Sequence, residues 1–271
     1  MQDSIRALFI GAHPDDCEYQ AGGLAAKYRR LGHTVKFVSV TNGDAGHHKI
    51  GGLELARRRL VETQRVAEEF GIEYEVWDVP DGYLVADIPN RDRMIRSIRA
   101  FKPDLIFTHR LNDYHPDHRA TGTLVQDASF LIRVPNICPD TPAIEYRLAI
   151  LSLRDGFTKP APFTPDVIVA IDDVLDEKAR MWHAHTSQFY EWLPYIDGYE
   201  AEVPLSDHER LAFTRRRIEA MERQITEGFR DLVLARYGEQ EGRAVCAAEA
   251  FEVSEYGRPL PPDEIDRWFP R

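Results

Sequence analysis

Short apolar runs of strand length alternate with longer segments of helical period along most of the chain. Six runs suit buried strands: 7–10, 35–40, 74–79, 104–108, 148–153 and 167–171. Strands that alternate with helices predict βαβ units, which build a mostly parallel sheet with helices on both faces. The sequence therefore predicts an α/β protein with a Rossmann-like, three-layer fold.

The helical segments and the loops between them indicate one domain that spans 1–271. Six segments are expected to be helical: 21–31, 53–70, 91–101, His115 to about 132, 173–185 and 206–235. Two segments depart from the alternation, because 135–165 holds six prolines and 186–204 is rich in aromatic residues. Both carry large apolar side chains, so we expect elaborated loops on a single domain and no flexible linker.

Composition excludes several classes of function. The formal net charge is −11, which argues against a broad electrostatic grip on nucleic acid. No apolar stretch approaches the roughly 20 residues of a membrane span, and the first residues lack the pattern of a signal peptide. The three cysteines follow no framework spacing. We therefore expect a cytoplasmic protein that acts on a small molecule.

Two polar motifs follow the first and the fourth predicted strands. The first is His-Pro-Asp-Asp-Cys-Glu at 13–18, and the second is His-Pro-Asp-His at 115–118. Sites in parallel sheets lie outside the carboxyl ends of the strands, so both motifs are expected at one edge. Pro116 suits a first helical turn, which places His115 near the N-cap and His118 within that turn.

The residue types of the two motifs suit a catalytic metal site. Imidazoles and carboxylates together provide three protein ligands and leave one position for water, as at catalytic zinc. Consecutive side chains in an extended loop diverge, so one of Asp15 and Asp16 would bind the metal while the other acts as general base. The spacing leaves open which aspartate has which role. Each motif alone also suits a helix cap or an ordinary surface or core histidine.

Together the two motifs resemble the PIG-L/LmbE-like family of zinc-dependent N-acetylglucosamine deacetylases. Further segments resemble the family at 41–46, at Glu54 to Glu62, at 184–188 and at 248–251. The resemblance implies a metal-dependent amidohydrolase. Such an enzyme would remove the N-acetyl group from an N-acetylglucosamine-type sugar or conjugate.

The resemblance also implies roles for individual residues. Three residues would bind Zn²⁺, or Fe²⁺ in the same ligand set: His13, Asp16 and His118. Asp15 would be the general base. His115 would stabilise the oxyanion or assist departure of the amine, and Asp117 would orient it or favour its charged form.

Substrate contacts are implied at three further positions. Arg59 would anchor the substrate, and Asp44 lies in the loop beyond the second predicted strand, where a pocket-lining residue and a solvated residue are both open readings. Some family members carry a tyrosine two residues before the first histidine of the second motif. Here that position is Asp113, and Tyr114 is the neighbouring candidate.

Two other classes of protein use similar residues. A non-catalytic metal-binding or sugar-binding protein would not need both Asp15 and His115. An Fe(II) oxygenase with two histidines and one carboxylate would present them on an all-β scaffold, which the βα alternation disfavours. The expected partner is an amino-sugar substrate with an undetermined aglycone, without nucleic acid or a membrane span. The aromatic segment 186–204 and the tail 254–271 are compatible with a homo-oligomer.

Overall fold

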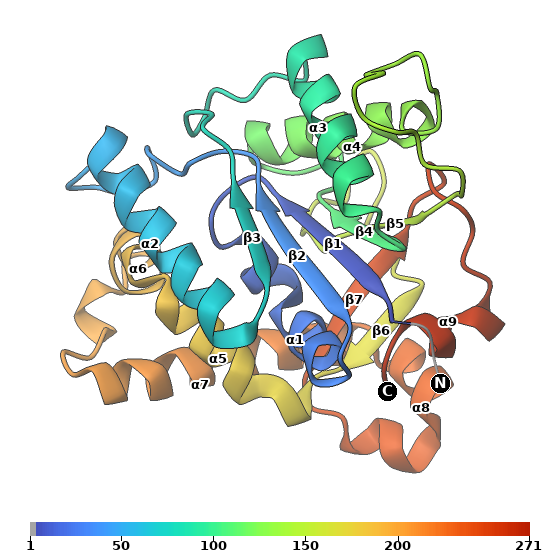
Figure 1. Cartoon of the computed structure of the whole chain (residues 1–271). Helices are drawn as coiled ribbons and strands as arrows, with labels where there is room; N and C mark the ends of the chain where they lie inside the picture. The colour runs from blue at the N-terminus through green and yellow to red at the C-terminus, as the bar shows by residue number, and fades with distance from the viewer. Residues whose placement is uncertain (1–3) are drawn as a thin grey trace.

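Seven strands form one sheet in the order β3-β2-β1-β4-β5-β7-β6 (Figure 1). The computed structural model describes residues 4–271. The strands are β1 (Arg6–Gly11), β2 (Thr34–Ser39), β3 (Glu73–Val76), β4 (Leu105–Thr108), β5 (Ala149–Ser152), β6 (Val167–Ala170) and β7 (Ala248–Val253). Neighbours from β3 to β5 pair in parallel, and β7 is antiparallel to β5 and β6. The expected α/β fold with a mostly parallel sheet is confirmed.

Helices cover both faces of the sheet (Figure 1). They are α1 (Asp16–Arg30), α2 (Gly52–Phe70), α3 (Ile88–Phe101), α4 (Pro116–Leu131), α5 (Leu175–Ala184), α6 (Leu193–Asp197), α7 (Asp207–Gly228), α8 (Arg230–Ala244) and α9 (Pro262–Trp268). One core lies under α3 and α4, and the other lies under α1, α2 and α5. Because side chains alternate along a strand, Phe9 enters the second core while Leu8 and Ile10 enter the first.

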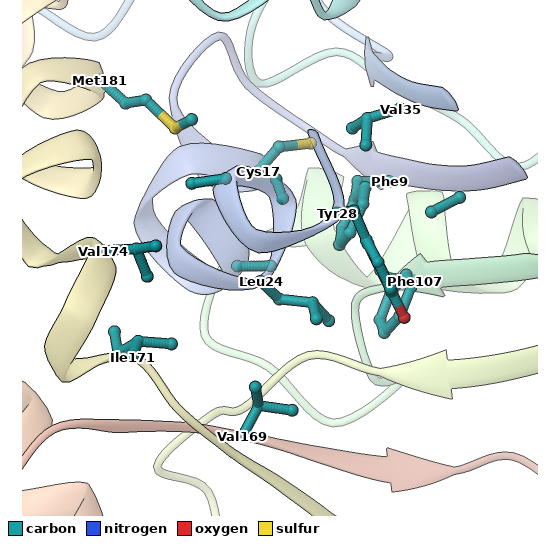
Figure 2. Packing of buried hydrophobic residues seen from close by; sticks show 14 of the residues in the cluster. Phe9, Cys17, Leu24, Tyr28, Val35, Phe107, Val169, Ile171, Val174 and Met181 are labelled. Carbon is teal, nitrogen blue, oxygen red and sulfur yellow. The ribbon is translucent and has the colours of Figure 1, made fainter. Parts of the chain in front are cut away.

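Helix α1 lies between the sheet and α5. Figure 2 shows Leu24 beside Phe9 and Phe107 on one side of α1, with Met181 and Val174 on the other. The rings of Phe9 and Phe107 stack with their centroids 4.4 Å apart. This packing fixes α1 on the sheet, and α1 begins within the first polar motif.

The first helix starts earlier than the sequence predicts. α1 begins at Asp16, earlier than the expected residue 21, and its backbone leaves helical geometry at Ala21. The carboxylate of Glu249 accepts the backbone N–H groups of Gly23 and Leu24 at 2.8 and 2.7 Å. Glu249 therefore caps the second half of α1. It comes from β7, a strand that was not predicted because two glutamates interrupt its apolar residues.

Two other expected boundaries also differ. The helix predicted over 206–235 is two helices, because Phe229 leaves helical geometry between α7 and α8. The third strand ends at Val76 and does not reach residue 79. Within residues 4–271 no helix is long and apolar enough to cross a membrane. Residues 1–3, part of the segment in which no signal peptide was predicted, lie outside the described residues.

The strand order creates a crevice at one end of the sheet. β1 is followed by β2 on one side, while β4 pairs on its other side. The loops after β1 and β4 therefore leave the sheet side by side at the point where the order reverses, the place where open α/β sheets bind ligands. The two polar motifs follow these two strands.

Candidate metal centre

Side chains from both motifs converge on one point at the crevice. His13 Nδ1 lies 3.2 Å from His118 Nε2, Asp16 Oδ2 lies 3.5 Å from His13 Nδ1, and Asp16 Oδ1 lies 3.4 Å from His118 Nε2. Neighbouring ligands in a tetrahedral zinc site with bonds of about 2.0–2.1 Å are about 3.3–3.4 Å apart. The three residues therefore have the chemistry and the spacing to hold a divalent metal ion.

A strained turn separates the two consecutive aspartates. Asp15 has φ 144°, a conformation that residues other than glycine rarely adopt and that costs on the order of 1–3 kcal/mol. Asp16 Oδ2 accepts the backbone N–H of His13 at 2.7 Å, which closes the turn. Gly11 permits the close approach, because a Cβ there would lie 2.6 Å from that of Asp16.

Carboxylates that the motif analysis did not assign face the far sides of the two candidate histidine ligands. Asp81 Oδ1 lies 3.1 Å from His13 Nε2, and Asp113 Oδ1 lies 3.0 Å from His118 Nδ1. Such partners fix the orientation of a metal-binding imidazole and raise its basicity. Little in the sequence indicates that these two aspartates belong to the site. Asp81 stands in a Pro-Asp-Gly turn after the third strand, and Asp113 lies two residues before the second motif.

The charges of the centre are balanced by its own imidazoles. Burial acts to raise the pKa of Asp16, but His118 and His109 hold it well below its usual value. Burial lowers the pKa of His118, and Asp16 and Asp113 outweigh burial and raise it to about 9. Within residues 4–271 no lysine or arginine forms an ion pair with Asp16. A protonated histidine thus supplies the positive charge that a metal ion would supply.

Two other histidines lie close enough to be considered as ligands. His109 stacks on His118 with centroids 3.9 Å apart, but its Nε2 accepts the backbone N–H of Ala12 at 3.1 Å. That nitrogen is therefore not free for a metal. His115 can be grouped with His13 and His118, with one nitrogen from each ring within 4.8 Å of the others. His115 is thus an alternative to Asp16 as the third ligand.

Asp15 provides a carboxylate that is not needed as a ligand. It is buried, and it lines the cavity that also contains the three candidate ligands. Burial and the neighbouring charge of Asp16 raise the pKa of the Asp15 carboxyl to about 7. The structure thus places one aspartate of the pair among the converging ligand atoms and the other beside them in the cavity.

His115 caps the N-terminus of α4, as its position before Pro116 predicts. Its Nδ1 accepts the backbone N–H of Asp117 at 3.2 Å. A neutral imidazole with an accepting Nδ1 carries its proton on Nε2, so the ring has one N–H left to donate. Burial, His13 and His118 lower the pKa of His115.

Asp117 contacts His115 through its backbone N–H, while its side chain has other partners. Its carboxylate accepts the backbone N–H groups of Gly82 and Leu84 at 2.7 and 3.2 Å and lies 3.4 Å from His13 Nε2. Its charge does not outweigh the influences that favour the neutral form of His115. Asp117 therefore joins the 82–84 loop to the metal centre.

Arg59 and Asp44, both expected near substrate, do not line the cavity. The buried Arg59 guanidinium donates to Gly46 O at 2.7 Å and to the Gln188 side chain. Gly43, with φ 67°, makes room for it, because a Cβ there would lie 2.5 Å from Arg59 Nη1. Asp44 Oδ1 accepts the backbone N–H of Asp81 at 2.9 Å. These contacts organise the loops behind the centre.

A cavity of about 510 Å³ opens beside the metal centre. Tyr114 lines it, as expected, and is 68% exposed. The opposite wall comes from the π-helical turn Gln188–Trp192, α6 and α7. The whole lining is rich in aromatic and amide side chains and also includes Asp197 and Arg217. The aromatic and amide residues are Tyr19, Gln20, Trp182, Gln188, Phe189, Tyr199 and Gln224. The volume is that of a site for a small organic ligand.

Comparison with known proteins supports the interpretation of the two motifs. Residues 8–129 match the model of the family described as PIG-L, GlcNAc-PI de-N-acetylase. The diacetylchitobiose deacetylase of Thermococcus kodakarensis is 30% identical over 210 residues, which cover 72% of this chain and 76% of that protein. These matches show the family of the chain.

Two further relatives bear on the fold and on the range of reactions. The structure of N,N'-diacetylchitobiose deacetylase from Pyrococcus horikoshii has a TM-score of 0.70 at 23% identity, covering 94% of this chain and 85% of that one. It shows that the fold is shared. A 4-oxalmesaconate hydratase of Pseudomonas putida is 24% identical over 197 residues, covering 70% of this chain and 76% of that protein. Relatives of this chain thus include both a deacetylase and a hydratase.

Proposed function

The chain belongs to the PIG-L family, and from that premise we propose that it is a metal-dependent amidohydrolase that removes the N-acetyl group from an N-acetylglucosamine-type sugar or conjugate. One observation carries the proposal. His13 Nδ1, His118 Nε2 and the two oxygens of the Asp16 carboxylate approach one another to 3.2–3.5 Å, and the Asp15 carboxylate lines the same cavity without being needed as a ligand. A purely metal-binding site would have no use for that carboxylate.

His13, Asp16 and His118 would hold the ion, which is Zn²⁺ or Fe²⁺. When bound, a divalent ion there would polarise the amide carbonyl and make a water molecule more acidic. Asp15 takes the proton from the attacking water and returns it to the leaving amine. A carboxylate that is raised in pKa by burial suits both halves of this transfer.

His115 stabilises the oxyanion in this scheme. Because its Nδ1 is occupied by the backbone N–H of Asp117, its Nε2–H is the group that can donate to the developing negative charge. A neutral donor held by a helix N-terminus needs no rearrangement as the charge forms. Asp117 fixes the loop and the His13 ring.

The cavity wall supports an amino-sugar substrate. The largely exposed ring of Tyr114 offers a face for a sugar ring, and the amides of Gln20 and Gln188 can bond to hydroxyl groups. The diacetylchitobiose deacetylase among the relatives acts on a sugar of this class, as its name states.

The hydratase relative provides the second candidate function. A hydratase adds water across a carbon–carbon double bond, and it too needs a base that takes a proton from water. The 24% identity over 70% of this chain keeps that reaction within the range of the fold. The aromatic and amide side chains favour the sugar, because an unsaturated polycarboxylic acid would require several cationic side chains, and within residues 4–271 Arg217 is the one arginine or lysine that lines the cavity.

The decisive experiment measures acetate release from a panel of N-acetylglucosamine conjugates. The protein is stripped of metal, reloaded with Zn²⁺ or Fe²⁺, and compared with the Asp15→Asn variant prepared in the same way. We expect metal-dependent release by the wild type. The variant should retain its metal and lose about 10²- to 10⁴-fold in kcat, as for removal of a general base.

The control reaction is the addition of water to an unsaturated dicarboxylate. The loss of the ultraviolet absorption of the double bond measures its rate. Hydration without acetate release would replace the proposed function by the second candidate. Loss of metal from Asp15→Asn would instead show that the ligand and base roles of the two aspartates are exchanged.

A further inference from the structure

An arginine that forms no hydrogen bond or ion pair with residues 4–271 lies at the same edge of the sheet as the metal centre. Arg154 stands two residues beyond the end of β5, the strand that pairs with β4. The backbone N–H of Leu153 donates to Thr108 O at 2.7 Å, so the segments that follow β4 and β5 are still hydrogen-bonded to each other where they leave the sheet. Arg154 thus emerges beside the loop that leads to His115.

Arg110 occupies the matching position beyond β4, and the contrast with Arg154 is informative. Arg110 forms ion pairs with Asp155 at 2.8 Å and with Glu252 at 3.2 Å. Arg154 is half-buried, and within residues 4–271 it forms no hydrogen bond, ion pair or cation–π contact; its Nε is fully buried without an acceptor. Burial raises the pKa of Glu222 on α7 and the charge of Arg154 acts to lower it, but that carboxylate is paired with Lys178 at 2.6 Å. Burying such a donor without a partner is unfavourable, so the position requires an explanation.

A second cavity of about 250 Å³ lies at Arg154. Met221 and Gln224 of α7 line both this cavity and the one at the metal centre, so the two adjoin across this helix. Three phenylalanines, Phe157, Phe163 and Phe229, line the second cavity. Asp155 also lines it, but its carboxylate is paired with Arg110 at 2.8 Å. The two cavities therefore share part of their wall, and Arg154 lines the one next to the metal centre.

The charge of Arg154 also reaches the metal cavity. Burial raises the pKa of Tyr19, and the strongest opposing influence is the positive charge of Arg154. Tyr19 lines the metal cavity beside the candidate ligands. The guanidinium is thus close to the space that the substrate would occupy.

We propose that Arg154 binds an anionic group, a carboxylate or a phosphate, on the aglycone of the substrate. The planar guanidinium has five N–H donors whose geometry matches these two groups. The apolar wall around it strengthens the interaction by excluding water. The position of the sugar end rests on the proposed function, whereas the anion site rests on Arg154 and the two adjoining cavities.

The test uses substrates that differ only in the charge of the aglycone. They are the carboxymethyl glycoside of N-acetylglucosamine, its neutral carbamoylmethyl counterpart and the phosphonomethyl glycoside. Acetate release gives the ratio of kcat/KM for each charged substrate over the neutral one. Calorimetry with the corresponding deacetylated glycosides gives the ratio of Kd values without requiring turnover.

We expect the wild type to prefer a charged glycoside, and the carboxylate and phosphonate arms identify which anion fits. Arg154→Ala should lower the charged-over-neutral ratio by about 10- to 100-fold, as for loss of a charge-assisted bidentate contact. The ratio for Arg154→Lys should lie between those of the wild type and Arg154→Ala, because lysine keeps the positive charge but lacks the paired N–H donors of the guanidinium. Arg216→Ala, which removes an exposed arginine of α7, is the matched control and should leave the ratio unchanged.

An unchanged ratio in both Arg154 variants, or no preference for charge in the wild type, would overturn the proposal. Thermal unfolding identifies a variant that fails to fold, and Arg154→Lys then decides. If no glycoside loses acetate but calorimetry retains an Arg154-dependent preference, the proposed function fails and the anion site stands. If acetate is released but the charged-over-neutral ratio is the same in the wild type and in both Arg154 variants, the proposed function stands and the anion site fails.

Discussion

The molecule contains two buried clusters of ionisable side chains, and they are built differently. In the first, His13, Asp16 and His118 direct acceptor atoms at one another across 3.2–3.5 Å. In the second, Lys178 Nζ lies between Glu222 Oε1 and Glu249 Oε1, at 2.6 Å from each. Both are shielded from water, so each needs a positive charge among its acceptors.

A lysine supplies that charge in only one of the two clusters. Lys178 supplies the cation. The Glu249 carboxylate also accepts the backbone N–H groups of Gly23 and Leu24 at the start of the second half of α1. That cluster holds α1, α5 and α7 to β7. The first cluster depends on protonation of a histidine or on a metal ion, and it opens into a cavity. The comparison separates a structural cluster from one built to hold an external ion.

The largest expected effect comes from removing one of the converging ligand atoms. His118→Ala should lose bound metal and with it all measurable turnover, because two ligands remain from a set of three. Metal content by elemental analysis and acetate release are the two measurements. His208→Ala, which removes an exposed histidine of α7, is the matched control. Full metal occupancy in His118→Ala would exclude it from the ligand set.

A smaller effect is expected from a histidine beside the same cluster. His115→Ala should lower kcat by about 10²- to 10³-fold with metal retained, as for loss of an oxyanion donor. Kinetics and metal content must be measured on the same preparation. If the metal is lost as well, His115 is a ligand, and the group that it forms with His13 and His118 becomes the better description of the centre.

The convergence of the candidate ligands could be predicted from the sequence because they lie in two short motifs. Both motifs directly follow strands, and parallel strands bring their carboxyl ends to a common edge whatever the loops do. The divergence of Asp15 and Asp16 also followed from local geometry. Strand–helix alternation was sufficient for the sheet and for the layers of helices.

The surrounding residues could not be predicted, because tertiary contacts decide their positions. Asp81 and Asp113 face the histidines only because irregular loops fold back on the centre. Arg59 carries the charge of a substrate-binding residue, but the loop at Gly43 and Gly46 encloses it. Strand β7 was not predicted because a glutamate at position 249 interrupts its apolar pattern. Glu249 can be buried there because it bonds to the backbone of α1 and to Lys178 of α5, and such contacts cannot be recognised from the local sequence.

The structural cluster offers the opposite perturbation. Lys178→Met removes the cation and leaves two buried carboxylates facing each other, which should cost about 3–5 kcal/mol in the free energy of unfolding. Urea denaturation measures the loss, and Lys49→Met, at an exposed lysine, is the control. Metal content of the folded variant should be unchanged. A loss of metal at full stability would show that the two clusters are not independent.

The smallest effect sharpens the comparison at the metal centre itself. Asp113→Asn keeps the shape of the side chain that faces His118 Nδ1 but removes its charge. Loss of such a partner weakens metal binding by about 10- to 100-fold, because the imidazole becomes less basic and less firmly oriented. Competition with a chelator measures the affinity. Asp155→Asn removes a carboxylate that serves Arg110 and should leave metal affinity unchanged. Equal affinities in all three proteins would mean that Asp113 only holds the loop, through its bond to the backbone N–H of His115.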